Sequence, residues 1–239
     1  MSDARTYRKA EKTRQRILKA AIAEFSEQGL AGARIGQIGA AARVNKALLY
    51  YYFHDKEALY AAALEEVAGK VAENALAVLE MDCSAGERML RFALLHFDRV
   101  TGQRAFQSLM QQEMVRFREG QSGAMQILAK KAFGPMIAEV QVVAEQGIKS
   151  GELCDVDWMQ MVYAALGANV FYLLSAPMVR LTSKRDPLNP TMIATRRAAA
   201  VEFLGKAIFV DRKRGARLAK KVLALTPMPE GAKQEKKMA

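Results

Sequence analysis

The chain has 239 residues, 51% of them hydrophobic, which suits one or two globular domains with a sizeable core. No apolar run approaches the roughly 18 residues that span a membrane, and the polar N-terminus lacks the apolar stretch of a secretory signal. The two cysteines, Cys83 and Cys154, are too few for a disulfide framework and lack metal-ligand spacing. We therefore expect a cytoplasmic protein with no metal site and no membrane partner.

The net charge of +11 is concentrated at the two ends of the chain. Residues 1–60 carry 11 Lys or Arg and 6 Asp or Glu, residues 61–210 carry 16 of each, and residues 211–239 carry 9 and 3. A polyanion is attracted only where the charge lies, so the ends are the candidate nucleic-acid surfaces. We expect residues 1–12 to form a basic flexible arm, which a DNA groove orders or which is simply frayed.

Apolar residues at helical spacing predict a first helix that begins at Thr13. Leu18, Ile22 and Phe25 fall on one face of this helix. Gly29 follows them and is a natural helix stop. We expect this helix to support the stretch that comes next.

The stretch 34–53 predicts two short helices joined by a tight turn. Ile35, Ile38 and Ala42 form one buried stripe on the first of them. The second begins after Asn45, a residue type that caps helix N-termini by accepting a backbone N–H. Two short helices in this arrangement indicate a helix-turn-helix.

The second short helix has one face to bury and one face to present. Leu49 and Phe53 lie one turn apart and must point inward. At about 100° per residue, this turns a small, basic and aromatic set of side chains outward: Lys46, Ala47, Leu48, Tyr50 and Tyr51. Such a face suits a DNA major groove, because Lys and Tyr reach phosphates and a small residue lets the backbone approach base edges.

These motifs resemble the N-terminal DNA-binding domain of the tetracycline-repressor (TetR) family of bacterial transcription regulators. The resemblance covers residues 13–59 and rests on Ala23-Glu24-Phe25, Gly29, Ile35, Ile38, Val44-Asn45-Lys46, Leu49-Tyr50-Tyr51-Tyr52-Phe53, Lys56-Glu57 and Leu59. The rest of the chain agrees with the family only in its helical outline. For the whole chain, the resemblance implies a DNA-binding domain joined to a regulatory and dimerisation domain.

Three departures from the family pattern affect the DNA sequence that is read. Arg43 stands where the family usually has Gly in the turn, so a left-handed backbone there would cost about 1–2 kcal/mol. Arg34 replaces the usual Ser or Thr at the start of the second helix, which exchanges a cap for a phosphate contact. Ala47 and Leu48 replace the common Gly and Thr, which removes a hydroxyl from the reading face.

The free face and the resemblance together predict how a double-stranded DNA operator is bound. Lys46 and Ala47 would approach base edges, and Leu48 would contact a thymine methyl. The other predicted contacts are to phosphates and come from Arg34, Asn45, Tyr50, Tyr51 and Lys56. These eight residues form the predicted DNA site.

Helical patterns continue beyond this region, so we expect an all-α fold: a three-helix DNA-binding domain followed by a larger helical ligand-binding and dimerisation domain. Asp55 caps a helix that runs to about residue 80, Ser84 and Glu87 form a capping box that opens the next helix, and Asp155 and Asp157 form a helix-entry pair before residue 158. The other expected elements are helices over 84–100, 104–118, 121–148 with a kink at Gly134-Pro135, and 158–175, a long loop over 177–190, and a helix over 191–210. The predicted domains are 1–12, 13–58, 59–210 and a basic, partly disordered tail over 211–239.

Small residues on the last two regular helices suggest close packing against a second copy of the chain. They are Ala164, Ala165, Gly167, Ala168, Ala198, Ala199, Ala200 and Gly205. The family resemblance implies a homodimer through these helices. Ordinary packing within one chain is the alternative.

Soft and aromatic side chains in the middle of the chain suggest an apolar effector pocket, a site that the resemblance also implies. The candidates for ligand binding are Phe92, His96, Met110, Met114, Phe117 and Tyr163. Plain core packing is the stronger interpretation of such a stripe, and His96 is more often a satisfied core residue. The ligand itself stays unknown.

The basic tail allows two interpretations. A short amphipathic helix could touch DNA or an anionic surface, but a solvated extension is favoured, with residues after Pro227 disordered.

No phosphate-binding loop, HExxH or CxxC motif occurs, so we expect neither catalysis nor a cofactor. The predicted function is a sequence-specific transcriptional repressor released by a small hydrophobic or amphipathic ligand. The alternatives are a ligand-independent dimeric DNA-binding or architectural protein and, third, a membrane-surface protein.

Overall fold

The computed structural model of the chain describes residues 2–121 and 123–229, with all their side chains except those of residues 2–5 and 104. This described part is built from helices, and its β structure is an isolated bridge between Leu153 and Phe209. The predicted all-α fold class is confirmed.

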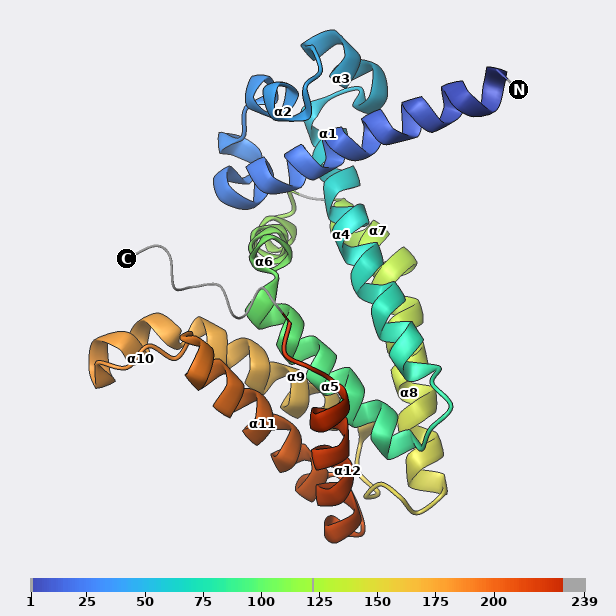
Figure 1. Cartoon of the computed structure of the whole chain (residues 1–239), viewed down its shortest axis with the longest axis vertical. Helices are drawn as coiled ribbons and strands as arrows, with labels where there is room; N and C mark the ends of the chain where they lie inside the picture. The colour runs from blue at the N-terminus through green and yellow to red at the C-terminus, as the bar shows by residue number, and fades with distance from the viewer. Residues whose placement is uncertain (1, 122, 230–239) are drawn as a thin grey trace. The chain divides into compact units, whose positions relative to one another are not determined.

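The chain forms two compact units, and both contain segments that are distant in sequence (Figure 1). Unit 1 comprises Met1–Ala72 and Arg104–Gly134. Unit 2 comprises Glu73–Gln103 and Pro135–Ala239. Each unit has its own buried side chains, and each is described separately below.

Unit 1 contains the predicted helix-turn-helix and the helices that support it. Its elements are α1 (Ser2–Gly32), α2 (Ile35–Ala42), α3 (Lys46–Phe53), most of α4 (Lys56–Leu79), α6 (Arg104–Arg118), α7 (Ala124–Leu128) and a π-helical turn (Ala129–Phe133). α1 packs against both α2 and α6. At the centre, the rings of Phe25 and Tyr60 meet edge to face, with their centroids 5.1 Å apart. This contact joins α1 to α4.

The helix α1 starts earlier than predicted, and the predicted stop at Gly29 is a break inside it, after which α1 continues to Gly32. It begins at Ser2, so residues 2–12, which were predicted to be a flexible arm, form its first turns. This segment contains no Gly or Pro, and Ala, Glu, Lys and Arg favour a helix. Gly29 has a φ of 68° inside α1, which breaks the helical backbone at this glycine without ending the helix.

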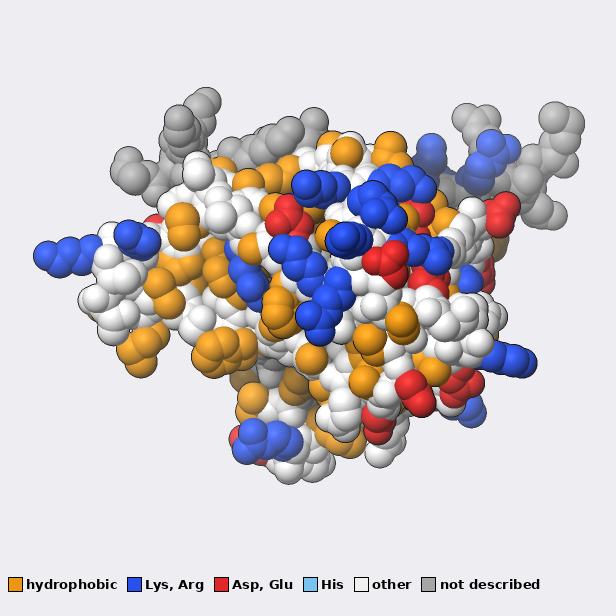
Figure 2. Space-filling model, turned by 90° about the horizontal axis from the view of Figure 1, so that it is seen from below, with side chains coloured by type: hydrophobic (Ala, Val, Ile, Leu, Met, Phe, Trp, Pro, Cys, Tyr) orange, Lys and Arg blue, Asp and Glu red, His pale blue; other side chains and the backbone are white. Residues whose placement is uncertain are grey.

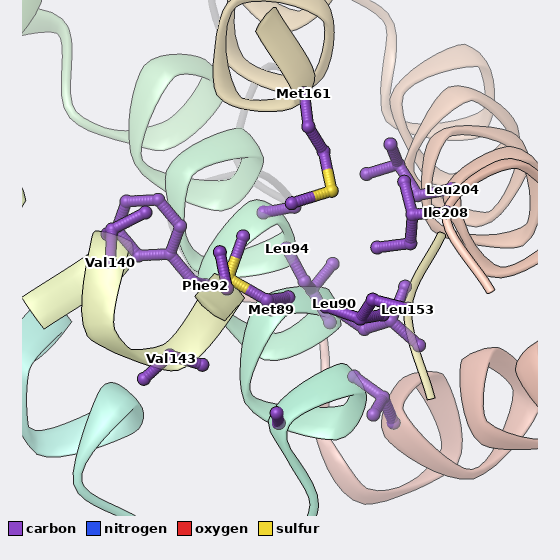
Figure 3. Packing of buried hydrophobic residues seen from close by; sticks show 14 of the residues in the cluster. Met89, Leu90, Phe92, Leu94, Val140, Val143, Leu153, Met161, Leu204 and Ile208 are labelled. Atoms are coloured by element: carbon purple, nitrogen blue, oxygen red, sulfur yellow. The ribbon is translucent and has the colours of Figure 1, made fainter. Parts of the chain in front are cut away.

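Unit 2 is a bundle of helices around α5. Its elements are the last turns of α4, α5 (Ala85–Gly102), α8 (Gly134–Lys149), α9 (Trp158–Leu174), α10 (Ala176–Ser183), α11 (Pro190–Ala207) and α12 (Arg212–Leu225). α5 packs against α9, α11 and α12. Figure 3 shows Met89 and Leu90 of α5 on the side of Leu204 of α11 and of Ile208, which directly follows α11, with Met161 pointing toward Met89 from α9.

The predicted starts of two helices in unit 2 are confirmed by their caps. The Ser84 hydroxyl accepts a bond from the Glu87 N–H at 3.3 Å, which begins α5. Asp157 accepts bonds from the N–H groups of Met159 and Gln160, which begins α9. Short polar side chains before an apolar run were therefore sufficient signals for these boundaries.

The loop predicted over residues 177–190 is wrong in its first half, where α10 forms. Pro177 lies in the first turn of α10, where backbone N–H groups have no partner within the helix. The missing N–H of proline therefore costs nothing there, and Pro177 is compatible with the start of a helix. No single helix in the described part is long and apolar enough to cross a membrane. The bent pair α9 and α10 passes that test by length and composition only.

The helix predicted over residues 121–148 is interrupted close to its predicted kink. A π-helical turn separates α7 from α8 and ends immediately before Gly134. A Cβ atom at Gly134 would lie 2.7 Å from the carbonyl oxygen of Ala129, so the turn requires glycine at this position.

The favoured prediction for the start of the basic tail, a solvated extension, is wrong. Residues 212–225 form α12, whose Gly215, Ala219 and Val222 are buried. A Cβ atom at Gly205 of α11 would lie 2.6 Å from the carbonyl oxygen of Gly215, so the two helices cross closely. The alternative, a basic amphipathic helix, is confirmed for this segment. Residues 230–239 of the predicted tail lie outside the described residues.

Candidate functional site

The face of α3 that the sequence predicts to be free is exposed in the structure. Leu49 is fully buried and Phe53 is 6% exposed, whereas Tyr51 is 81% exposed. The other predicted outward side chains are also exposed: Lys46, Ala47, Leu48 and Tyr50. One side of this eight-residue helix is therefore held in the core and the other side is exposed.

The buried side of α3 is anchored against α1. The guanidinium carbon of Arg14 lies 5.6 Å from the centre of the Phe53 ring, within range of a cation–π interaction. Burial of side chains such as Leu49 and Phe53 stabilises a fold by about 1.5–3 kcal/mol each. Rotation of α3 about its axis would expose both residues, so these two side chains determine which face α3 presents.

The turn between α2 and α3 is held by a cap and a left-handed residue. The Asn45 carboxamide oxygen accepts a bond from the Leu48 N–H at 2.8 Å, as predicted for a cap. Arg43 has φ 54° and ψ 49°, the left-handed conformation that the family's usual Gly would adopt without strain. A Cβ atom at Gly39 would lie 3.0 Å from the Val44 carbonyl oxygen, so Gly39 serves the turn; nothing in the structure explains Gly36.

The predicted phosphate contacts at the two borders of the helix-turn-helix differ in their surroundings. The Arg34 side chain is exposed and makes no capping bond, while its backbone N–H donates to Glu24 at 3.0 Å. The Lys56 ammonium donates to the Ala31 carbonyl oxygen at 3.2 Å, at the end of α1. Because an ammonium has three donors, this bond leaves two for a phosphate. Asp55 caps α4 through the Ala58 N–H at 2.7 Å, as predicted.

Within unit 1, α6 packs against α1 and so supports the helix-turn-helix, a contact that no local sequence pattern predicts. The Ser108 hydroxyl donates to the Ser26 carbonyl oxygen at 2.5 Å, which fixes α6 to α1. Arg116 lies 5.4 Å from the centre of the Tyr60 ring on α4. Burial raises the pKa of the Tyr60 phenol, and the negative charge of Glu113 raises it further. No local pattern announces contacts between residues about 80 positions apart in the chain.

The six predicted ligand-binding residues are divided between the two units. Unit 1 holds Met110, Met114 and Phe117 on α6, and unit 2 holds Phe92 and His96 on α5 and Tyr163 on α9. Phe92 and Met110 are buried, whereas Met114, Phe117 and Tyr163 are exposed. Within either unit taken alone, the structure does not gather these residues around one cavity.

A small apolar cavity lies in unit 2 between α5, α9 and α11. Its walls are Met89, Phe92, Ala93, Met161, Val162, Ala165, Leu166, Leu204 and Ile208. Its volume is about 10 Å³, the space of about one water molecule. Thioethers stand on opposite sides of it, Met89 on α5 and Met161 on α9, and such side chains repack readily. The cavity therefore needs the surrounding helices to separate before it could admit an organic molecule.

His96 is a partly buried polar group one turn along α5 from the cavity wall at Ala93. Its Nδ1 lies 3.3 Å from the Asn169 amide nitrogen, which also donates to the Ala93 carbonyl oxygen at 3.4 Å. Burial, together with the charge of Arg99, lowers the pKa of His96 to about 4. His96 is therefore neutral near pH 7, with Nδ1 as the acceptor. Sequence reasoning missed Asn169, although it is the single amide in the apolar stretch of α9 after Gln160.

The three-helix arrangement with one anchored and one open face on α3 defines a helix-turn-helix DNA-binding domain, here joined to an all-helical body. Residues 17–63 match the sequence model of a family described as bacterial regulatory proteins, tetR family. This match makes the N-terminal domain of the chain similar to the regulators of the tetR family.

Similar proteins agree with this assignment. The HTH-type transcriptional repressor NicS of Pseudomonas putida is 42% identical over 82 residues, which are 34% of this chain and 38% of NicS. The chain thus matches well under two thirds of the length of these curated relatives. A gamma-butyrolactone receptor (ArpA like protein) superposes with a TM-score of 0.61 at 18% identity, covering 91% of this chain and all of that one. The regulator FadR of Bacillus subtilis, in complex with stearoyl-CoA, superposes with a TM-score of 0.61 at 19% identity. The superposition covers 80% of this chain and 96% of that one. These structures share the fold.

Arg43→Gly is expected to stabilise unit 1 by about 1 kcal/mol, because Gly adopts a positive φ without the crowding of a Cβ atom. Urea unfolding followed by circular dichroism measures the gain. Arg43→Ala removes the same charge and keeps the Cβ atom, so it serves as the control and should give no gain. An equal gain in both variants would assign the effect to the charge of Arg43 instead of to its backbone.

Stability is expected to fall as the pH drops from 6.5 to 4 because of His96. Its folded-state pKa of about 4 lies below its ordinary value of 6.5, so the unfolded chain takes up the proton first. The full effect is about 3 kcal/mol, present above pH 6.5 and lost toward pH 4. Urea unfolding across this range should show a smaller fall for His96→Gln.

Proposed function

We propose that this protein is a homodimeric, sequence-specific DNA-binding transcriptional regulator, a repressor that leaves its operator when a small hydrophobic or amphipathic ligand binds. The observation that carries the proposal is the open face of α3 with Leu49 and Phe53 locked beneath it. The named repressor function of the relative NicS supports the direction of regulation. Such a regulator works in the cytoplasm, where its DNA lies.

The exposed face assigns a distinct task to each group of side chains in a major groove. Lys46 and Ala47, in the first turn of α3, approach base edges, and the small Ala47 lets the backbone come close. Leu48 contacts a thymine methyl. The predicted phosphate contacts come from Arg34, Asn45, Tyr50, Tyr51 and Lys56, and they fix the register of α3 on the duplex.

A homodimer is proposed from the apolar surface of α9 and α11. Phe171 and Phe203 are about 70% exposed, and Tyr163 and Leu174 are exposed as well. Large side chains in such numbers on neighbouring helices mark an interaction surface. Two copies would also place two reading helices on successive turns of the duplex, about 34–36 Å apart.

The ligand site is proposed to be an expanded form of the cavity between α5, α9 and α11, with Phe92 in its wall and His96 as a polar anchor. Tyr163, the other predicted anchor, is exposed on α9 and lies on the surface proposed for the dimer. Neutral His96 already accepts a hydrogen bond from the Asn169 amide at Nδ1, and a donor group of a ligand could replace that amide. The FadR structure contains the amphipathic molecule stearoyl-CoA within the same fold. A ligand that prefers the open body would shift the population away from the DNA-bound form by its differential affinity.

Within unit 1, α6 connects the predicted ligand contacts Met110, Met114 and Phe117 to the helices that support the reader. Its Ser108 is bonded to α1. A displacement of α6 would therefore pull on the end of α1 and on Tyr60 of α4. Both helices flank α2 and α3, so the spacing of the two readers in a dimer would change.

Lys46→Ala should weaken binding to an operator selected from a random duplex library by tenfold or more, because a base contact is worth about 1–3 kcal/mol. Binding to random DNA should fall much less. Fluorescence anisotropy with both duplexes measures the two losses, and Lys130→Ala, another exposed lysine of unit 1, is the control. Equal losses on both duplexes would reduce Lys46 to a phosphate contact. No loss on either would remove α3 from the DNA site.

Phe171→Asp should convert the dimer to a monomer, because it places a charge in the apolar surface of α9. Sedimentation velocity at micromolar concentration measures the mass of each variant. Val156→Asp changes another exposed apolar residue of unit 2 outside α9 and α11 and should leave the dimer intact. A monomeric parent chain, or a Phe171→Asp variant that stays dimeric, contradicts the proposed interface.

A further inference from the structure

The outer face of α12 carries a row of positive side chains that the DNA-reading domain does not use. Residues 212–225 contain six Lys or Arg and no Asp or Glu. Lys213, Arg217 and Lys220 are exposed and follow one another at helical spacing, on the side opposite the buried Gly215, Ala219 and Val222. Figure 2 views the molecule from the end where α12 lies in Figure 1 and shows Lys and Arg side chains gathered there.

Two other cations of α12 hold the helix on the body. Arg214 lies 2.9 Å from the Glu152 carboxylate, and Lys221 lies 2.8 Å from that of Glu87. Both carboxylates are nearly inaccessible to solvent, so these cations balance charges of the core. Lys213, Arg217 and Lys220 make no ion pair with any side chain in the part of the chain that the structure describes. We refer to these three residues as the α12 stripe.

Within the described part of the chain, the α12 stripe acts on the start of its own helix: the backbone N–H groups of Arg214 and Lys213 lower the pKa of the Asp211 cap, and the charges of Arg217 and Lys213 lower it further. Like charges three or four residues apart on a helix repel each other and destabilise it. A face that serves only to be solvated commonly mixes both signs, which would remove this repulsion. The body between residues 61 and 210 is balanced, with 16 Lys or Arg and 16 Asp or Glu. The stripe is therefore a local concentration of charge and not a continuation of a basic surface.

The shape of the stripe favours a phosphate backbone over a lipid surface. An amphipathic helix binds a membrane by inserting its apolar face, and the apolar face of α12 is already buried against α5 and α11. From Lys213 to Lys220 the stripe extends about 10 Å along the helix axis. One strand of duplex DNA presents a phosphate about every 3.4 Å of its axis, so the stripe matches about three phosphates.

We propose that the α12 stripe is a second, sequence-independent binding surface for duplex DNA, located on unit 2 and separate from α3. Its three cations contact successive phosphates of one strand and read no bases. The surface adds salt-sensitive affinity for any duplex and allows one molecule to hold a second DNA segment. It does not depend on the proposed repressor function, because it needs neither an operator nor a ligand.

The test measures DNA binding in a full-length Lys46→Ala, Tyr51→Ala variant, whose reading face is disabled. The probe is a fluorescent 30-base-pair duplex of random sequence, titrated at several salt concentrations. This variant should still bind the duplex. Adding Arg217→Glu and Lys220→Glu should lower the slope of log affinity against log salt by about 1.8, since each lost phosphate contact removes about 0.9. Affinity at low salt should fall by tenfold or more.

Lys149→Glu with Arg185→Glu is the matched control, because both residues are exposed in unit 2 and the change in net charge is the same. It should leave the salt slope unaltered. Equal losses in the two double variants would assign the effect to net charge and overturn the proposal. An unchanged slope in the stripe variant would overturn it as well.

Two further measurements keep the result decisive. Thermal unfolding checks that the stripe variant is folded; if it is not, Arg217→Gln with Lys220→Gln replaces it and should lower the slope in the same direction. Vesicles of phosphatidylserine and phosphatidylcholine provide the competing anionic surface. Stripe-dependent binding to these vesicles without binding to the duplex would assign the surface to lipid and overturn the proposal.

Discussion

The burial of Leu49 and Phe53 is the constraint on which the candidate function depends. Both side chains point from α3 into the core of unit 1, and Arg14 covers the Phe53 ring. A helix of eight residues has little stability of its own, so its orientation comes from these contacts. They leave Lys46 and Tyr51 on the opposite face, which is why a short helix can present the same surface to every duplex it meets.

Buried carboxylates play the corresponding role in unit 2. Asp98 accepts two bonds from the Arg197 guanidinium, at 2.6 and 2.8 Å, which fixes α11 to α5. Glu87 and Glu152 are paired with cations of α12. Breaking such a pair leaves a buried charge unmatched and is strongly destabilising. These pairs therefore connect the C-terminal helix to the core, although its sequence alone resembles a solvated basic tail.

The helices α5 and α11, which the Asp98–Arg197 pair joins, also line the apolar cavity. α5 and α11 form its walls with α9, and the space between them is about 10 Å³. Methionines at the wall and the weakly bonded His96 and Asn169 are the parts that can rearrange at low cost, whereas the Asp98–Arg197 pair and the Gly205–Gly215 crossing cannot. Any opening for a ligand would begin on the α9 side.

The sequence alone determined the elements whose signals are local. Asn45, Asp55, Ser84 and Asp157 marked helix starts, Gly29 marked a break, and helical spacing identified which side of α3 is buried. Only the tertiary structure decided that Ser108 donates a hydrogen bond to α1, that Asn169 is bonded to His96, and that α12 packs against the body of unit 2. It also separated the candidate pocket residues, since Phe92 is buried and Tyr163 is exposed. The physical reason is that caps and periodicity act within one or two turns of chain, whereas partners across a fold are chosen by packing between segments far apart in sequence.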